Sequence, residues 1–246
     1  MVQNYKFTIM YDGSRYFGWQ RLGNKDTIQG RIENVLSRMC DADITINGAG
    51  RTDAGVHAQG MVANAILETE MTPSEIRSYV NNYLPEDIAI INVEPAKDRF
   101  HARYNATGKQ YRYTCYDGDI KPVFDRKYVT VLEKIPDIET MRKAAAYLIG
   151  THDFFSFQGN SKMKKSTVRN IDTIKISRNG GYIYFDYHGD GFLQNMIRIV
   201  TGTLLEIGYG NMKPEDIPDI MQARDRSKAG PKLPPEGLCL VKVDYE

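Results

Sequence analysis

Residues 44–67, ITINGAGRTDAGVHAQGMVANAIL, place a charged loop between two predicted strands. The stretches ITING (44–48) and VHAQGMVANAIL (56–67) are rich in apolar and β-branched residues, which is typical of strands. Residues 48–58 hold three glycines and three alanines around Arg51, Asp53 and His57. Small side chains add little to a core, whereas glycine lets the backbone turn sharply and approach a ligand closely. Two interpretations remain open: a functional loop, or a turn in which Arg51 pairs with a carboxylate.

The segments around this stretch predict the order β-α-β-β-α-β for residues 1–95. Residues 5–11 and 88–95 have strand composition, and the second ends at a proline. Asp26, three residues before Gln29, predicts a capped helix start, and a second helix is expected at Thr72, with Pro73 and Glu75 following. The first helix has apolar residues at helical spacing: Ile28, Ile32, Val35, Leu36 and Met39. This order is typical of ferredoxin-like units, in which helices cover one face of an antiparallel sheet.

The second part of the chain is similar but less regular. We expect strands at 109–116 and 238–245, a hairpin of 168–178 and 181–188, helices at 138–149 and 196–207, and a short helix opening at Pro214. Residues 151–168 are predicted to form an insertion with a basic tip. The expected fold is therefore α+β, with two ferredoxin-like halves and antiparallel sheets, and with domains at 1–104 and 105–246.

Composition limits the possible classes of protein. The 246 residues carry a formal net charge of +1, so overall charge does not indicate a nucleic-acid partner. The three cysteines, Cys40, Cys115 and Cys239, lack zinc-site spacing, and scattered thiols fit a reducing compartment. The first residues lack the pattern of a signal peptide, and no apolar run has the length of a membrane span. We therefore expect a cytoplasmic protein.

Five motifs together resemble those of the TruA-type tRNA pseudouridine synthases, and they occur in the family's order. Besides GAGRTDAGVHA (48–58), they are YDGSRYFGWQ (11–20), FHARYNATGKQYRY (100–113), DGFLQNMIRIVTGTLLEIG (190–208) and EGLCLVKVDY (236–245). The resemblance implies an isomerase that converts uridine to pseudouridine at positions 38, 39 and 40 of the tRNA anticodon stem-loop. It also implies a homodimer, an active-site cleft between the two halves, and a reaction that uses no cofactor and no metal.

By the same resemblance, Asp53 is the catalytic carboxylate. It could attack C1′ or C6, or remove the 2′ proton, and the sequence does not choose among these routes. Each route starts from an ionised carboxylate, although burial raises the pKa of an aspartate. Arg198 matches the family's arginine that pairs with this aspartate, and its apolar neighbours favour a buried, partnered charge over a surface arginine.

Two further residues match the family's substrate-binding positions. Tyr111 matches the tyrosine that contacts the base, although Tyr111 and Tyr113 could simply be aromatic residues on one sheet face. Arg51 matches the arginine that fills the place of the flipped nucleotide. The alternative is that Arg51 only forms an ion pair with Asp53. His57 is expected to be structural rather than a general base.

Local positive charge is expected to bind the phosphates of the tRNA, with an affinity that falls steeply as salt rises. The candidate cations are Arg15, Arg21, Arg99, Arg103, Lys162, Lys164, Lys165, Arg169, Lys228 and Lys232. Three other functions stay open: a related enzyme that modifies other uridines, an RNA-binding protein without catalysis, and a metal-dependent phosphatase or nuclease using Asp12 and Asp53.

Overall fold

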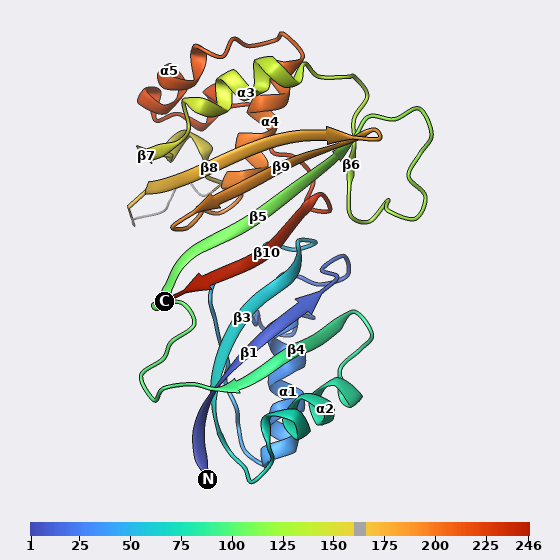
Figure 1. Cartoon of the computed structure of the whole chain (residues 1–246), viewed down its shortest axis with the longest axis vertical. Helices are drawn as coiled ribbons and strands as arrows, with labels where there is room; N and C mark the ends of the chain where they lie inside the picture. The colour runs from blue at the N-terminus through green and yellow to red at the C-terminus, as the bar shows by residue number, and fades with distance from the viewer. Residues whose placement is uncertain (160–165) are drawn as a thin grey trace. The chain divides into compact units, whose positions relative to one another are not determined.

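The computed structural model describes residues 1–159 and 166–246, and these form two compact units (Figure 1). Unit 1 contains Met1–Thr107 together with Cys239–Glu246, and unit 2 contains Gly108–Leu238. The C-terminal residues, which sequence analysis assigns to the second domain, thus belong to unit 1. Among the described residues, no helix is long and apolar enough to cross a membrane.

The sheet of unit 1 is built on strand β3 (His57–Glu68) and its neighbour β1 (Val2–Tyr11), which run antiparallel. Strand β4 (Ile88–Pro95) pairs antiparallel with the other edge of β1, and the short β2 (Asn47–Gly48) pairs antiparallel with β3. Strand β10 (Leu238–Tyr245) adds a parallel pair at the start of β3, through Cys239 opposite His57. The catalytic loop predicted at residues 48–58 therefore leads into the central strand of this sheet.

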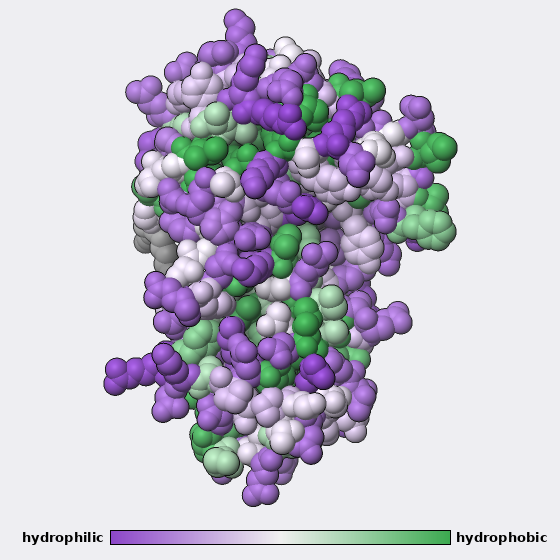
Figure 2. Space-filling model, in the orientation of Figure 1, coloured by the Kyte–Doolittle hydropathy of each residue, from purple (hydrophilic) through white to green (hydrophobic). Residues whose placement is uncertain are grey.

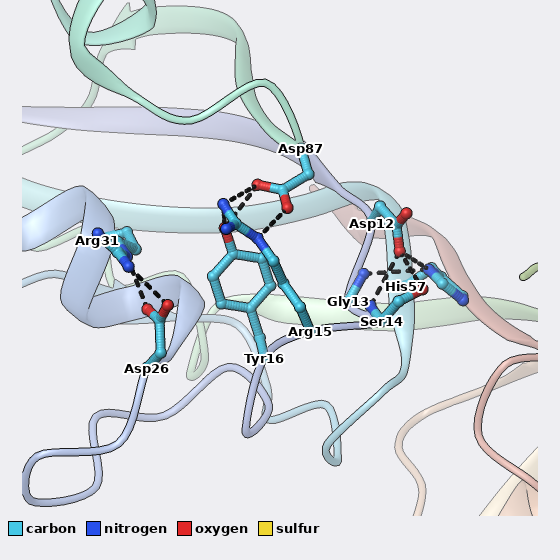
Figure 3. Close-up of polar contacts among 9 residues, drawn as sticks. All are labelled: Asp12, Gly13, Ser14, Arg15, Tyr16, Asp26, Arg31, His57 and Asp87. Atoms are coloured by element: carbon cyan, nitrogen blue, oxygen red, sulfur yellow. Dashed lines mark hydrogen bonds and ion pairs between the residues drawn. The ribbon is translucent and has the colours of Figure 1, made fainter.

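Helices α1 (Ile28–Cys40) and α2 (Pro73–Tyr83) lie on one face of this sheet (Figure 1). The predicted cap of α2 is confirmed, because Glu75 N–H donates to Thr72 Oγ1 and Thr72 N–H donates to Glu75 Oε2. The predicted cap of α1 is wrong by one residue: Thr27 accepts from Gly30 N–H. Asp26 instead receives two hydrogen bonds from Arg31, at 2.7 and 2.6 Å, and these lower the pKa of the Asp26 carboxyl (Figure 3).

The sheet of unit 2 has the strand order β5-β9-β8-β7, and all neighbours are antiparallel. The strands are β5 (Ala106–Tyr116), β7 (Gly150–Asp153), β8 (Val168–Asn179) and β9 (Tyr182–Gly189), with a short parallel β6 (Thr130–Val131) on β5. The hairpin predicted across Asn179-Gly180-Gly181 is confirmed, since β8 and β9 pair antiparallel there and both glycines have positive φ, 56° and 85°. The predicted insertion is wrong at its start, because residues 150–153 form a strand of the sheet.

The described part of unit 2 contains three α-helices: α3 (Ile138–Ala146), α4 (Met196–Gly208) and α5 (Asp216–Ala223). Helix α4 is almost wholly buried, which fits the apolar residues found on all its sides. Two short 3₁₀ turns, η1 (Phe155–Phe157) and η2 (Arg226–Lys228), complete the unit. Lys162, Lys164 and Lys165 of the predicted basic tip lie outside the described residues.

The chain thus has a mixed α/β fold with mostly antiparallel strands and, within residues 1–159 and 166–246, five α-helices. The space-filling view shows mainly hydrophilic residues on one face, with smaller hydrophobic areas between them (Figure 2). That distribution is ordinary for a folded domain, because scattered apolar side chains are common on protein surfaces.

Candidate active site

The loop between β2 and β3 carries Arg51 and Asp53 in unit 1. Arg51 is exposed, Thr52 is buried, and Asp53 is intermediate between them. The loop closes on itself through a hydrogen bond from Val56 N–H to Asp53 O, at 3.2 Å. Asp53 therefore lies at a fixed turn immediately before the first residues of the central strand.

A second loop, residues 12–20, packs against the back of the Asp53 loop. Gly18 has φ +89°, and a Cβ added there would lie 2.6 Å from Thr52 O. A Cβ added at Gly13 would overlap the backbone carbonyl of Val56. These two glycines allow the two backbones to approach more closely than any other residue would permit. The composition of the motif YDGSRYFGWQ therefore has a packing reason in addition to any role in binding.

Hydrogen bonds join the same two loops. Trp19 N–H donates to Thr52 O at 3.1 Å, and Gly55 N–H donates to Tyr16 O at 3.3 Å. The hydroxyls of Tyr11 and Thr52 lie 2.9 Å apart in buried surroundings. Three contacts thus fix the backbone on both sides of Asp53.

The Asp87 carboxylate organises the outer part of residues 12–20 (Figure 3). It accepts hydrogen bonds from the Tyr16 hydroxyl at 2.5 Å and from Arg15 Nη2 at 3.1 Å. Burial, followed by the hydrogen bond to Asp87, raises the pKa of Tyr16 well above its usual range. Arg15, a predicted phosphate contact, is therefore already paired with a carboxylate in unit 1.

His57 has a supporting position rather than one at the surface of the loop. Its ring is buried, and Nδ1 accepts a hydrogen bond from Gly13 N–H at 3.1 Å (Figure 3). Asp12 Oδ1 lies 3.2 Å from the same nitrogen and also accepts from Ser14 N–H at 2.9 Å. The amide of Gly13 favours a ring with Nδ1 unprotonated, whereas the carboxylate favours a protonated one. In both states the ring connects residues 12–14 to the start of β3.

Tyr111 lies on β5 in unit 2 and is 8% exposed. Its ring meets Phe192 edge to face, with centroids 5.4 Å apart. The prediction that Tyr111 and Tyr113 share one face of the strand is confirmed by the alternation of burial along β5. Tyr113 has a structural role, since its hydroxyl donates to Pro234 O at 2.8 Å and contacts Thr130 Oγ1 at 2.6 Å.

Arg198 lies in the first turn of α4 and is 7% exposed, so the predicted buried position is confirmed. Its Nε donates to Leu233 O at 2.7 Å, and its Nη1 donates to Asn195 Oδ1 at 2.9 Å. Asn195 itself has φ 60°, a left-handed conformation that asparagine tolerates better than most residues. Both of these acceptors are neutral groups.

The carbonyl of Leu233 is held in place by close packing of residues 230–235 on α4. A Cβ added at Gly202 would overlap Pro231 O, and Gly230 N–H donates to Thr203 Oγ1 at 2.9 Å. Sequence reasoning missed Asn195 and Leu233 as partners of Arg198. The sequence signal for this contact was Gly202, because a glycine inside a buried helix indicates that another segment approaches the helix closely. Gly230 lies in that other segment.

The structure thus places Arg51 and Asp53 on one loop of unit 1, and Tyr111 and Arg198 in unit 2. The pairing of Asp53 with Arg198 stays a prediction. Within the described residues, no group of three or more His, Cys, Asp or Glu side chains is arranged to hold a metal ion.

Comparison with known proteins identifies related chains. The family model described as tRNA pseudouridine synthase matches residues 8–105 and 144–246. A tRNA pseudouridine synthase A from a Bacillus species is 48% identical over 230 residues, which cover 93% of this chain and 94% of the relative. A tRNA pseudouridine synthase A 2 from Bacillus cereus is 42% identical over 245 residues, which cover 99% of this chain and 100% of the relative. A tRNA pseudouridine synthase A from Clostridium kluyveri is 42% identical over 244 residues, with coverages of 99% and 100%.

Proposed function

This chain belongs to the tRNA pseudouridine synthase family, and we propose that it acts on uridines 38, 39 and 40 of the anticodon stem-loop with Asp53 as the nucleophile. The enzyme is an isomerase that converts uridine to pseudouridine in tRNA. The role of Asp53 is supported chiefly by the fixed backbone around it. Gly18 allows the close approach of residues 12–20, Trp19 N–H donates to Thr52 O, and Gly55 N–H donates to Tyr16 O. Catalysis requires such a group to be held in position before the substrate binds.

The proposed reaction needs one carboxylate and no redox change. The N1–C1′ bond breaks, the uracil rotates while bound, and a C5–C1′ bond forms. C5 then loses its proton and N1 gains one, so substrate and product are isomers. Asp53 starts the reaction as a carboxylate, and a nearby cation favours that ionised form. Arg198, a buried guanidinium that donates to Leu233 O and Asn195 Oδ1, is the cation proposed for this role.

Two further side chains complete the proposal. Tyr111, whose ring is held at its edge by Phe192, is proposed to contact the base. Arg51 is exposed on the Asp53 loop and can fill the space left by an extruded nucleotide, which lowers the cost of keeping the base unstacked. The four side chains of this proposal are Arg51 and Asp53 of unit 1 and Tyr111 and Arg198 of unit 2.

We propose two ferredoxin-like halves, a homodimer, a cytoplasmic location and a reaction without a cofactor. The candidate phosphate contacts Arg99, Arg103, Lys228 and Lys232 are exposed, which supports their availability to RNA.

The test is a map of uridine-to-pseudouridine conversion in unmodified tRNA transcripts with uridine at position 38, 39 or 40, in EDTA. Wild type should convert these positions, and Asp53→Asn should reduce the rate by about 10³-fold or more, as expected for loss of a group that reacts with the substrate. Asp43→Asn is the matched control, because it removes an exposed carboxylate shortly before the same loop and should leave the rate unchanged.

Other results would revise the proposal in separate ways. Conversion by Asp53→Asn at the wild-type rate would exclude Asp53 as the nucleophile. Conversion by wild type only at other uridines would keep the chemistry and replace the target. A dependence on added divalent metal, seen as inactivity in EDTA, would contradict a reaction that uses no cofactor.

A further inference from the structure

The loop that follows β4 displays an aromatic residue that the proposed reaction does not use. Residues 100–105, FHARYN, open the motif FHARYNATGKQYRY and lie before β5, which begins at Ala106. Tyr104 in this loop is 77% exposed. The loop follows β4 in Figure 1 and lies within unit 1.

Buried side chains hold the base of this loop. Asn4 Nδ2 donates to Phe100 O at 2.9 Å, and Ala102 N–H donates to Asn64 Oδ1 at 2.9 Å. The Tyr245 hydroxyl donates to Ala102 O at 2.6 Å. Asn4 and Asn64 are 3% and 5% exposed, and burial raises the pKa of Tyr245 so that its hydroxyl stays protonated. Since buried polar groups are costly without partners, the conformation of this loop is strongly specified.

The tip of the loop is also ordered by its own hydrogen bonds. His101 N–H donates to Asn105 Oδ1 at 2.8 Å, and Asn105 N–H donates to His101 O at 3.0 Å. Arg103 N–H donates to His101 Nδ1 at 3.1 Å. The rings of His101 and Tyr104 lie against each other, with centroids 4.2 Å apart and planes tilted by 39°. Tyr104 is therefore presented outward by a backbone and a neighbouring ring that are already fixed.

The sequence on the N-terminal side of Tyr104 carries a net positive charge. Residues 97–104 contain three cations, Lys97, Arg99 and Arg103, and one carboxylate, Asp98, which gives +3 − 1 = +2. All four of these charged residues are exposed. A single exposed tyrosine is ordinary, but an exposed, fixed aromatic ring in a loop rich in cations is a combination that binds unpaired nucleotides.

This loop is separate from the catalytic loop of the same unit. Asn64, which holds Ala102, lies seven residues along β3 from His57, where the Asp53 loop ends. At about 3.3 Å per residue, that separation is roughly 20 Å. A nucleotide stacked on Tyr104 is therefore a different one from the uridine that reacts at Asp53.

We propose that Tyr104, supported by His101 and flanked by Arg103, is a stacking platform for an unpaired base of the tRNA substrate, outside the reacting uridine. The ring binds the face of a base without selecting its identity, and Arg103 contacts the adjoining phosphate. The proposal rests on the proposed function for the identity of the RNA as tRNA.

The test compares tRNA affinity and steady-state kinetics for Tyr104→Ala, Tyr104→Phe and wild type. Tyr104→Ala should raise Kd and KM by about 5- to 150-fold, the equivalent of stacking one base, and leave kcat at saturation unchanged. Tyr104→Phe should stay within about twofold of wild type, because stacking needs the ring and not the hydroxyl. A thermal melting comparison checks that each variant is folded.

Tyr83→Ala is the matched control in the same unit. Tyr83 is 53% exposed, packs on Tyr79 with centroids 4.8 Å apart, and has the Arg38 guanidinium 5.3 Å from its ring centroid. It is thus an exposed tyrosine with an aromatic neighbour and a cation, but it lies at the end of α2 and not on the fixed loop. Its removal should leave Kd within about twofold of wild type.

The salt dependence of tRNA binding distinguishes the contribution of the Tyr104 ring from that of the Arg103 charge. Tyr104→Ala should keep the wild-type slope of log Kd against log salt, whereas Arg103→Gln should reduce that slope by about 0.7 to 0.9. An unchanged Kd for Tyr104→Ala, or a Tyr104→Phe variant as weak as Tyr104→Ala, would overturn the platform. Failure of wild type to modify positions 38–40 would instead refute the proposed target, while the affinity comparison would still decide the platform.

Discussion

The two regions that carry the proposed catalytic side chains are held by different kinds of contact. The loop with Asp53 is fixed mainly through backbone: Gly18 and Gly13 leave room for it, and main-chain hydrogen bonds join it to residues 12–20. Arg198 is fixed by its own side chain, which donates to Asn195 Oδ1 and Leu233 O. The position of the Asp53 loop therefore depends on glycines that leave room for it. The position of the Arg198 side chain depends on two specific hydrogen-bond acceptors.

This difference has a chemical reason. A short aspartate has few rotatable bonds, so fixing its backbone nearly fixes its carboxylate. A long arginine on a rigid helix keeps several free torsions, and hydrogen bonds to its guanidinium are needed to select one arrangement. We therefore expect the Asp53 loop to be disturbed most by added side-chain atoms. We expect the position of Arg198 to be disturbed most by removal of the side chain that accepts its hydrogen bond.

The largest effect is expected for Gly18→Ala. The new Cβ would lie 2.6 Å from Thr52 O, and the backbone there has φ +89°, so strain and overlap occur together. We expect a loss of about 3 kcal/mol or more in the free energy of unfolding, together with a large fall in activity, because the displaced segment carries Asp53. Chemical denaturation and the tRNA conversion rate are the two measurements.

Gly23→Ala is the matched control for this prediction. Gly23 also has positive φ, +49°, but a Cβ added there meets nothing within 4 Å. The control should therefore lose only the cost of a left-handed alanine, about 1–2 kcal/mol, and keep its activity. If both variants behaved alike, backbone conformation rather than close approach would explain the role of Gly18.

The sequence predicts the elements of this molecule better than it predicts their contacts. Local patterns locate most strands and helices, and the capping box at Thr72 is found because Glu75 lies three residues later. The cap of α1 is misplaced because Asp26 and Thr27 are both good capping residues, and the pairing of Asp26 with Arg31 decides between them. Strand β5 begins at Ala106, three residues before the predicted strand at 109–116, and residues 100–105 ahead of it are held by Asn4 and Asn64, which are distant in sequence.

The site shows the same limit. Asp53, Arg51, Tyr111 and Arg198 come from motifs that resemble a known family. The partners of Arg198 could not be predicted in this way, because Leu233 contributes a backbone carbonyl, which every residue type possesses. Asn195 is also hidden, since its left-handed conformation and its hydrogen bond to Arg198 depend on how residues 190–195 enter the helix.

A smaller effect on stability, but a clear one on activity, is expected for Asn195→Gly. Glycine accepts the φ of 60° without strain, so this change removes the amide acceptor of Arg198 and leaves the backbone conformation available. A hydrogen bond to a charged group is worth about 1.5–3 kcal/mol, so kcat/KM should fall by roughly 10- to 100-fold. Steady-state kinetics on a tRNA transcript measure this change.

Asp41→Gly provides the control for the backbone. Asp41 also has positive φ, 49°, and it ends α1 at an exposed position. Its replacement should leave kcat/KM unchanged, since it alters only the helix end. Wild-type activity in Asn195→Gly would show that the carbonyl of Leu233 is sufficient to position Arg198.

The smallest effect is expected for Tyr11→Phe in the backbone-held region. The change removes the hydroxyl that lies 2.9 Å from Thr52 Oγ1, and it should cost about 1 kcal/mol in stability because the buried Thr52 hydroxyl loses a partner. Activity should fall by no more than about threefold, since the main-chain hydrogen bonds around Asp53 remain. Combining Tyr11→Phe with Thr52→Val should restore most of the stability, because both polar partners are then gone. Denaturation of the four proteins in this cycle measures the coupling, and a loss of activity as large as that of Gly18→Ala would show that side chains, and not the backbone, hold the Asp53 loop.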